Sequence, residues 1–381
     1  MSYVKLEDPL MKGIGVTFHR KPQVPGPNPL LNGDGIVSAD SHWDVTEDIF
    51  YEGFPAHLKD KAPRVWFDRI WRMGSLATNL TEHSINTLEM VFTPGLYDLD
   101  IRMEHVLAEG VGQEILYPQN VMQLRGNPDL EVREWGFRLY NEWCAREGAR
   151  YPGRFHGVGI ISNWWDPGRA EAAVQQITDL GLKAMLLPTS PPNNPDGSEF
   201  NFAGEETERL FAAIAASGIP LTFHIGENFN LEGRGKHASW LLNVLAPFRK
   251  PFGQMAFGGV FDRNPTLKVV FAEGGINWVA SALQDAEMLY DSYDVLFEPR
   301  PKHRPSHYWH EHCYATFQND RIGLQLLDYI GADNVMWASD YPHPEGSYGF
   351  NYSSRQVVLD ATSEEVARKI LGGTAKKVFK L

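Results

Sequence analysis

The chain has 381 residues, of which 43% are hydrophobic and 12% aromatic, and this is enough apolar material for a large buried core. Its formal net charge of −13 argues against a nucleic-acid binder, which needs a basic face, and against charge-driven binding to anionic membranes. It contains no run of about 18 apolar residues, so we expect no membrane span.

The first 35 residues are rich in proline and glycine and lack the apolar core of a secretion signal. We expect them to form an arm over a catalytic domain of residues 36–381 or over a neighbouring subunit. Cys144 and Cys313 are the only cysteines. Two cysteines so far apart in a long chain indicate reduced thiols in a cytoplasmic protein, with a disulfide between them as the alternative.

Short apolar runs alternate with helical patterns along the rest of the chain. The runs predict strands at residues 36–40, 114–117, 155–161, 183–187, 220–224, 268–273, 313–317 and 335–339. Helices are predicted between them or after them, at residues 99–109, 130–147, 167–180, 205–217, 277–290, 321–330 and 363–378. Eight strands separated by helices predict an α/β fold in which a parallel sheet closes into a (β/α)8 TIM barrel.

Three segments are too long to be simple connections: residues 43–97, 189–204 and 229–263. All three begin near the barrel mouth at which parallel strands end, where insertions usually wall the pocket and select the substrate. The first is rich in aromatic residues. These rings form either an apolar lid or the contact that packs the insertion against the barrel, and the sequence leaves both alternatives open.

Four predicted strands end in side chains that can bind a metal ion. Asp40 and His42 follow the first strand, and residues two apart in a strand point to the same side, so both can reach one ion. His224, Glu273 and Asp340 end three later strands. Each alone has a plainer interpretation, such as a loop hydrogen bond, an ion pair or a helix cap. Their repetition at four strand ends predicts a metal site at the C-terminal mouth of the barrel.

This arrangement resembles the amidohydrolase superfamily, in the branch that includes the aminocarboxymuconate semialdehyde and resorcylate decarboxylases. The resemblance covers residues 36–381 and implies a metal-dependent (β/α)8 barrel. Members place an acid or a histidine, then any residue, then a histidine at strand one, a histidine at strand five and an aspartate at strand eight. Asp40, His42, His224 and Asp340 match these positions.

The sixth strand departs from that pattern, because Glu273 stands where many members have a histidine. With His343, which lies three residues after Asp340, it makes the chain similar to a subgroup of non-heme diiron monooxygenases built on this barrel. The resemblance implies two iron ions, with manganese or zinc as alternatives, and catalytic roles for Glu273, Asp340 and His343. The implied metal ligands are Asp40, His42, His224, Glu273, Asp340 and His343.

Three of these assignments have alternatives. His343 could orient Asp340 from behind instead of binding metal. His312, at the start of the seventh strand, is a weaker candidate for the second ion. Lys183 stands on the strand where related hydrolases carry a carboxylated lysine, but it begins that strand and so faces the opposite mouth.

The activity implied by this resemblance is hydroxylation of an unactivated C–H bond in a small organic substrate by O2. Electrons would come from an external donor, because no dinucleotide-binding or phosphate-loop motif is present. The alternative is a hydrolase or decarboxylase with one zinc or manganese ion. A third interpretation is a non-catalytic subunit. We expect a homo-oligomer or pairing with a homologous subunit.

Overall fold

A computed structural model of the chain describes residues 22–23, 26–45, 48–67, 71–73, 93–164, 166–191, 199–227, 234–235, 239, 242–245, 247–343 and 345–381. Most of the predicted arm, residues 1–21, lies outside the described part, as does much of the predicted first insertion. The division into an arm and a catalytic domain therefore stays a prediction.

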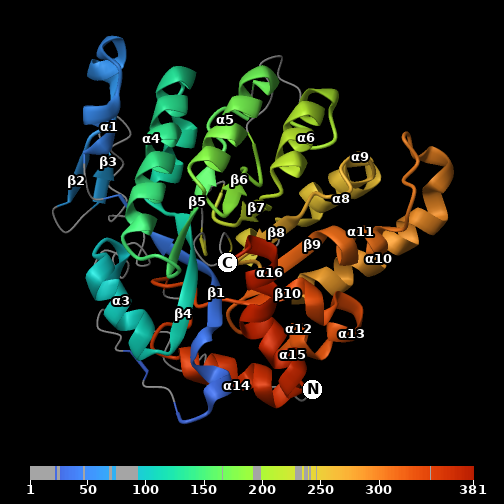
Figure 1. The fold of residues 1–381 in the computed structure, drawn as a ribbon. Coiled ribbons are helices and arrows are strands. Elements are labelled where there is room, and N and C mark those ends of the chain that lie inside the picture. Colours follow the sequence, from blue (N-terminus) through green and yellow to red (C-terminus); the bar gives the residue numbers. More distant parts are fainter. Residues whose placement is uncertain are drawn as a thin grey trace.

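Eight parallel strands follow one another around a barrel, in the order in which they occur along the chain (Figure 1). They are β1 (Gly33–Trp43), β4 (Val111–Pro118), β5 (Phe155–Ile160), β6 (Ala184–Leu186), β7 (Leu221–His224), β8 (Val269–Ala272), β9 (Cys313–Phe317) and β10 (Val335–Trp337). The predicted TIM barrel is confirmed, and each of the eight predicted strands is present with small differences at its ends.

Helices surround this barrel on the outside (Figure 1). The α-helices are α1 (Ile49–Gly53), α3 (Leu99–Ala108), α4 (Leu130–Ala149), α5 (Pro167–Asp179), α6 (Glu208–Ser217), α8 (Arg249–Phe257), α9 (Val260–Arg263), α10 (Asn277–Tyr293), α11 (Pro305–His312), α12 (Arg321–Gln325), α13 (Leu327–Ile330), α14 (Asn351–Ala361), α15 (Glu364–Arg368) and α16 (Thr374–Phe379). Shorter helical turns include η5 (Pro94–Leu96), η6 (Asn120–Gly126), η8 (Asp294–Leu296) and η10 (Lys369–Gly373), and β2 (Val65–Phe67) pairs with β3 (Trp71–Met73) in a separate hairpin.

Local chemistry explains where several helices begin and end. Asp98, Asp129 and Asp166 each accept backbone N–H bonds at the start of α3, α4 and α5. Gly218 ends α6 in the left-handed conformation that glycine adopts without strain. The predicted helix over residues 321–330 is divided into α12 and α13, and the last predicted helix is divided into α15, η10 and α16. α1, α8 and α9 lie within the predicted insertions, and α11 and α14 lie outside every predicted helix.

Three aromatic residues of the first insertion pack it against the barrel, whereas Tyr51 is 38% exposed. Trp43 and Phe50 are fully buried and Phe54 nearly so. The Trp43 indole N–H donates to the Tyr140 hydroxyl of α4 at 3.0 Å, and α1 lies against the same helix. For these three rings, packing rather than a lid is the correct interpretation. The side chains of the hairpin aromatics lie outside the described part.

The first and last strands meet through irregular bonds at the mouth of the barrel. The backbone N–H of Asp340 donates to the Asp40 carbonyl at 2.8 Å, and that of His42 donates to the Tyr341 carbonyl at 2.6 Å. The N–H of Ser339 donates to the Ser38 hydroxyl at 2.7 Å, and this hydroxyl donates to the Asp40 carbonyl at 2.8 Å. This seam joins the two segments that carry four of the six predicted ligands.

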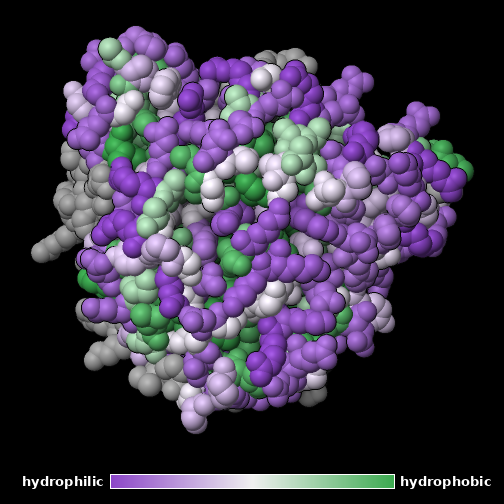
Figure 2. Space-filling view, viewed as in Figure 1, coloured by the Kyte–Doolittle hydropathy of each residue, from purple (hydrophilic) through white to green (hydrophobic). Residues whose placement is uncertain are grey.

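The surface and the cysteines bear on the remaining predictions. Cys144 and Cys313 are buried and not bonded to each other, as predicted. None of the described helices is both long and apolar enough to span a bilayer. The face in Figure 2 is largely hydrophilic, with hydrophobic residues in scattered patches. Tyr293 at the end of α10 and Val295 and Leu296 of η8 are at least half exposed. The expected oligomer stays a prediction.

The seam predicts the effect of one small substitution. Ser38→Ala leaves the buried Ser339 N–H without a partner, so we expect the free energy of unfolding to fall by about 1–3 kcal/mol. Urea denaturation measures it, with the exposed Ser281→Ala as the control, which should change stability by less than about 0.5 kcal/mol. Equal effects of the two substitutions would mean that the seam bond adds nothing.

Candidate metal centre

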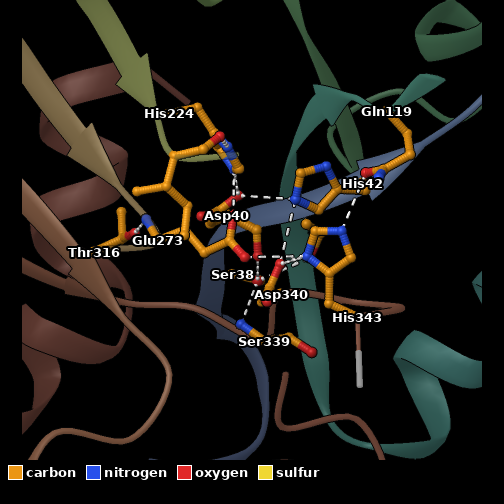
Figure 3. A network of polar contacts seen from close by, with 12 residues as sticks. Ser38, Asp40, His42, Gln119, His224, Glu273, Thr316, Ser339, Asp340 and His343 are labelled. Atoms are coloured by element: carbon orange, nitrogen blue, oxygen red, sulfur yellow. Dashed lines mark hydrogen bonds and ion pairs between the residues drawn. The ribbon is translucent and has the colours of Figure 1, made fainter. Parts of the chain in front are cut away.

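The structure brings all six predicted ligand residues together at the mouth of the barrel (Figure 3). Asp40 and His42 extend from β1, and His224 is the last residue of β7. Glu273 directly follows β8, and Asp340 and His343 lie in the segment after β10. Asp40, His42, Glu273 and Asp340 are buried, and the side chains of His224 and His343 are 12% and 11% exposed.

Carboxylates and imidazoles alternate within this cluster. His42 Nε2 lies 3.3 Å from Asp340 Oδ1 and 3.8 Å from Asp40 Oδ1. His224 Nε2 lies 3.3 Å from Asp40 Oδ1 and 3.0 Å from Glu273 Oε2. His343 Nδ1 lies 2.8 Å from Asp340 Oδ1 and 3.2 Å from Glu273 Oε1. Each imidazole is therefore flanked by two carboxylates.

Apart from these contacts between carboxylates and imidazoles, the polar atoms at the centre of the cluster are buried without hydrogen-bond partners. They are both carboxylate oxygens of Asp40 and Asp340, both ring nitrogens of His42, Nε2 of His224 and Nδ1 of His343. Such atoms cost about 1–3 kcal/mol each unless something else satisfies them. Two overlapping groups have ligand atoms within 4.8 Å of one another: Asp40, His42 and His224, and His42, Glu273, Asp340 and His343. The donor set suits a divalent cation, and the residues form a buried metal-binding site.

The protein alone perturbs the charges of these side chains strongly. Burial, opposed by His224, raises the pKa of Asp40 to about 7. Burial lowers the pKa of His224, but the Asp40 and Glu273 carboxylates outweigh it and the pKa rises to about 9. The same balance, with Asp340 and Glu273 as neighbours, raises the pKa of His343 above its usual range. Burial and the other two histidines lower the pKa of His42 well below its usual range.

Two of the acidic residues are held in a backbone conformation that is rare outside glycine. The φ angle is 69° at Glu273 and 54° at Asp340. This left-handed conformation costs energy in residues with a Cβ and often occurs at functional sites. The Glu273 N–H donates to the Thr316 hydroxyl of β9 at 2.8 Å, which helps to hold the bend. The bends let both carboxylates face the cluster directly after their strands end.

Residues that the sequence did not single out complete the surroundings of the cluster. Gln119 Oε1 lies 3.1 Å from His343 Nε2, so that Nε2 can donate to it while Nδ1 faces the cluster. The Tyr117 ring lies 4.8 Å from the His224 ring, between centroids. Both residues come at the end of the second predicted strand. This position at a strand end was the feature of the sequence that could have indicated their place at the site.

The two remaining candidates lie away from the cluster. His312 forms a hydrogen bond with the Leu267 carbonyl at 2.9 Å and stacks on Phe261. Lys183 donates to the Lys380 carbonyl at 3.4 Å, next to the start of β6.

A cavity of ≈ 150 Å³ opens beside His224. Its wall includes Ser190 after β6, Glu227 after β7, and Asn243 from the short helical segment at residues 242–244. Glu227 accepts the backbone N–H bonds of Thr189 and Ser190 and pairs with Arg125 of η6 at 2.7 Å. The cavity gives a small molecule a place next to the metal site.

A family model described as amidohydrolase matches residues 121–381. The chain belongs to the amidohydrolase family. It is 24% identical to the 2-amino-3-carboxymuconate-6-semialdehyde decarboxylase of Dictyostelium discoideum, over 73% of this chain and 76% of the relative. It is 22% identical to the γ-resorcylate decarboxylase of Rhodococcus jostii, over 76% of this chain and 93% of the relative.

A solved structure shares the fold. The 5-carboxyvanillate decarboxylase of Novosphingobium aromaticivorans, which was crystallised with bound manganese, aligns with a TM-score of 0.70 and 18% identity. The alignment covers 94% of this chain and all of that one. The two relatives and the solved structure described above are named as decarboxylases.

These relatives overturn the expected activity. The prediction of an oxygen-dependent diiron monooxygenase, an oxidoreductase, was wrong, because the relatives are decarboxylases, which transfer no electrons to O2. Nothing supports iron, and the solved relative holds manganese. Glu273 and His343, which suggested an oxygen-activating pair, are ligand types that suit many divalent ions, so they do not by themselves select a reaction.

The electrostatics of the metal-free cluster predict a pH effect. The pKa of Asp40 is about 7 in the folded protein against an ordinary value of 3.8, so the folded state holds this proton more tightly. The Asp40 contribution to the free energy of unfolding should therefore fall as the pH rises from about 4 to about 7. Asp40→Asn should flatten this slope and stabilise the chelator-treated protein at pH 8.

Thermal denaturation in a chelator from pH 4 to pH 9 measures the effect. The exposed Asp291→Asn is the control and should keep the slope of the unmodified protein. Identical slopes for Asp40→Asn and the unmodified protein would show that the Asp40 carboxyl is not perturbed.

Proposed function

We propose that this chain is a divalent-metal-dependent decarboxylase that acts on a small conjugated carboxylic acid without using O2. The observation that carries the proposal is the buried cluster of unpartnered ligand atoms, in a chain whose relatives are decarboxylases. Those relatives are named for acids whose carboxyl group adjoins an unsaturated or aromatic carbon. The second candidate is hydrolysis of a small substrate at the same site, because the matching family is described as amidohydrolase.

We assign metal binding to Asp40, His42, His224 and Asp340, with Glu273 and His343 completing the surroundings. Manganese is the favoured ion, because the solved decarboxylase holds it, and zinc suits the same donors. A divalent cation bound there would act as a Lewis acid toward a substrate oxygen. Asp40 and Asp340 would balance its charge, and the loops that line the cavity would place the substrate beside His224.

Decarboxylation breaks a carbon–carbon bond and leaves the electron pair on carbon, which must then receive a proton. We assign this proton to His343 and Glu273. Their atoms Nδ1 and Oε1 lie 3.2 Å apart, and the neighbouring carboxylates raise the pKa of the imidazole. Gln119 holds the far side of the His343 ring, so the ring presents Nδ1 to the cluster throughout. Both side chains are largely shielded from bulk water, being 11% and 4% exposed.

The proposal predicts release of CO2 from a suitable acid. Protein loaded with Mn²⁺ should convert at least one member of a panel of hydroxylated benzoic acids and carboxylated dienoic acids, under nitrogen as well as in air. Carbon-13 NMR of carboxyl-labelled acids measures the product. His42→Ala, which removes a central ligand, is the control and should be inactive. Full metal occupancy without CO2 release from any acid would contradict the proposal.

The division of labour within the cluster predicts different defects. Glu273→Gln and His343→Gln should lower kcat by about 10²–10⁴-fold, the usual effect of losing a proton-transfer group, and weaken Mn²⁺ binding by less than tenfold. His42→Ala should instead abolish Mn²⁺ binding. Calorimetry and steady-state kinetics separate these effects. Loss of the metal in all three variants would make Glu273 and His343 ligands rather than proton carriers.

A further inference from the structure

An ion pair is buried directly behind β1, close to the metal site but outside it. Arg102 of α3 is 0% exposed and Glu114 of β4 is 1% exposed. Arg102 Nε donates to Glu114 Oε2 at 2.6 Å, and Nη2 donates to Oε1 at 3.1 Å. Two buried charges are costly to desolvate and are tolerated only when their remaining polar atoms are also bonded.

The remaining bonds of this pair all go to the segments that carry the ligands or to the turn beside them. Arg102 Nη1 donates to the His42 carbonyl at 2.6 Å and to the Gly95 carbonyl of η5 at 3.1 Å. The Ser41 hydroxyl donates to Glu114 Oε1 at 2.8 Å. The guanidinium carbon also lies 4.6 Å from the ring centre of Tyr341, the residue after Asp340.

β1 needs such support at this point because its pairing with β4 is irregular. Ser38 pairs with Glu114 and Ser41 pairs with Leu116, so three steps along β1 match two along β4. The extra residue is a bulge, which bends a strand and leaves its local direction less determined by the ladder. The bulge falls where Asp40 and His42 must turn toward the cluster.

We propose that the Arg102–Glu114 pair is a positioning device for His42, an inference that rests on the proposed metal-dependent function. The guanidinium holds the carbonyl of His42 from behind while Glu114 holds the neighbouring Ser41. With its carbonyl and its neighbour fixed, the His42 backbone directs the imidazole into the cluster, where Nε2 lies 3.3 Å from Asp340 Oδ1. Through Tyr341 the same guanidinium also supports the segment that carries Asp340.

Arg355 provides a matched comparison, because it is equally buried but makes no such contacts. It donates to the Leu31 carbonyl at 2.8 Å and to the Glu109 carbonyl at 2.5 Å, and it lies over Trp337. A purely structural arginine should affect folding without changing metal affinity.

The test compares Arg102→Met/Glu114→Gln, which leaves no lone buried charge, with Arg355→Met. Both should lower the Tm of the metal-free protein. Only the double variant should weaken Mn²⁺ binding, by about 10–100-fold in Kd, as is usual when a partner that orients a ligand is lost, while Arg355→Met stays within about twofold. Ser41→Ala keeps the ion pair and serves if the double variant does not fold; its Kd should rise by about threefold or more.

An unchanged Kd in the folded double variant, or in Ser41→Ala if that is the variant measured, would overturn the inference. Should the unmodified protein bind no Mn²⁺, the proposed function fails, and crystal structures of the metal-free variants decide the positioning role. An increase of about 1 Å or more in the separation of His42 Nε2 and Asp340 Oδ1, absent in Arg355→Met, supports it. An unchanged separation refutes it.

Discussion

The backbone hydrogen bond from Asp340 to the Asp40 carbonyl joins the first and last strands of the barrel at the point where chemistry is possible. Both residues offer buried carboxylates to the same cluster, so closure of the barrel and assembly of the site are one event. Ser38 and Ser339 reinforce the seam from below, and Tyr341 accepts the N–H of His42 from above. A barrel that did not close here would leave the ligands of β1 and of the segment after β10 apart.

The arrangement of the cluster favours metal binding and lowers the stability of the metal-free fold. Glu273 and Asp340 have positive φ angles, and several central atoms are buried without hydrogen-bond partners. These features destabilise an isolated chain, but a bound cation would compensate for the unpartnered atoms. The neighbouring strands β7, β8 and β9 hold the strained backbone in place. The hydrogen bond from the Glu273 N–H, after β8, to the Thr316 hydroxyl of β9 is an example.

Much of the fold could be predicted because a strand in a closed barrel is buried on both faces and reads as a continuous apolar run. Val269 to Ala272 is such a run, and Leu221 to Phe223 departs from it only at Thr222. The residues that follow both strands, His224 and Glu273, are polar because they face the mouth. The same reasoning located His224 and Glu273. The β1 bulge and the Arg102–Glu114 pair could not be predicted, since they depend on contacts between α3, β1 and β4 that no local pattern reveals.

The chemistry could not be predicted from the ligands alone. Carboxylates and imidazoles at strand ends bind many divalent ions, and one barrel supports many reactions. Glu273 and His343 suggested an oxygen-activating pair, whereas the relatives are decarboxylases. The choice of reaction depends on the substrate and on its proton supply, and the types of the ligand residues do not specify either one.

The most direct test of the account is anomalous diffraction from crystals soaked in Mn²⁺. We predict a strong peak at the mouth of the barrel, about 2.0–2.3 Å from His42, His224 and at least one oxygen of Asp40 or Asp340, as expected for direct coordination. A map from fully soaked crystals with no peak among these atoms would contradict the central claim that the four strand ends build a site for a divalent cation.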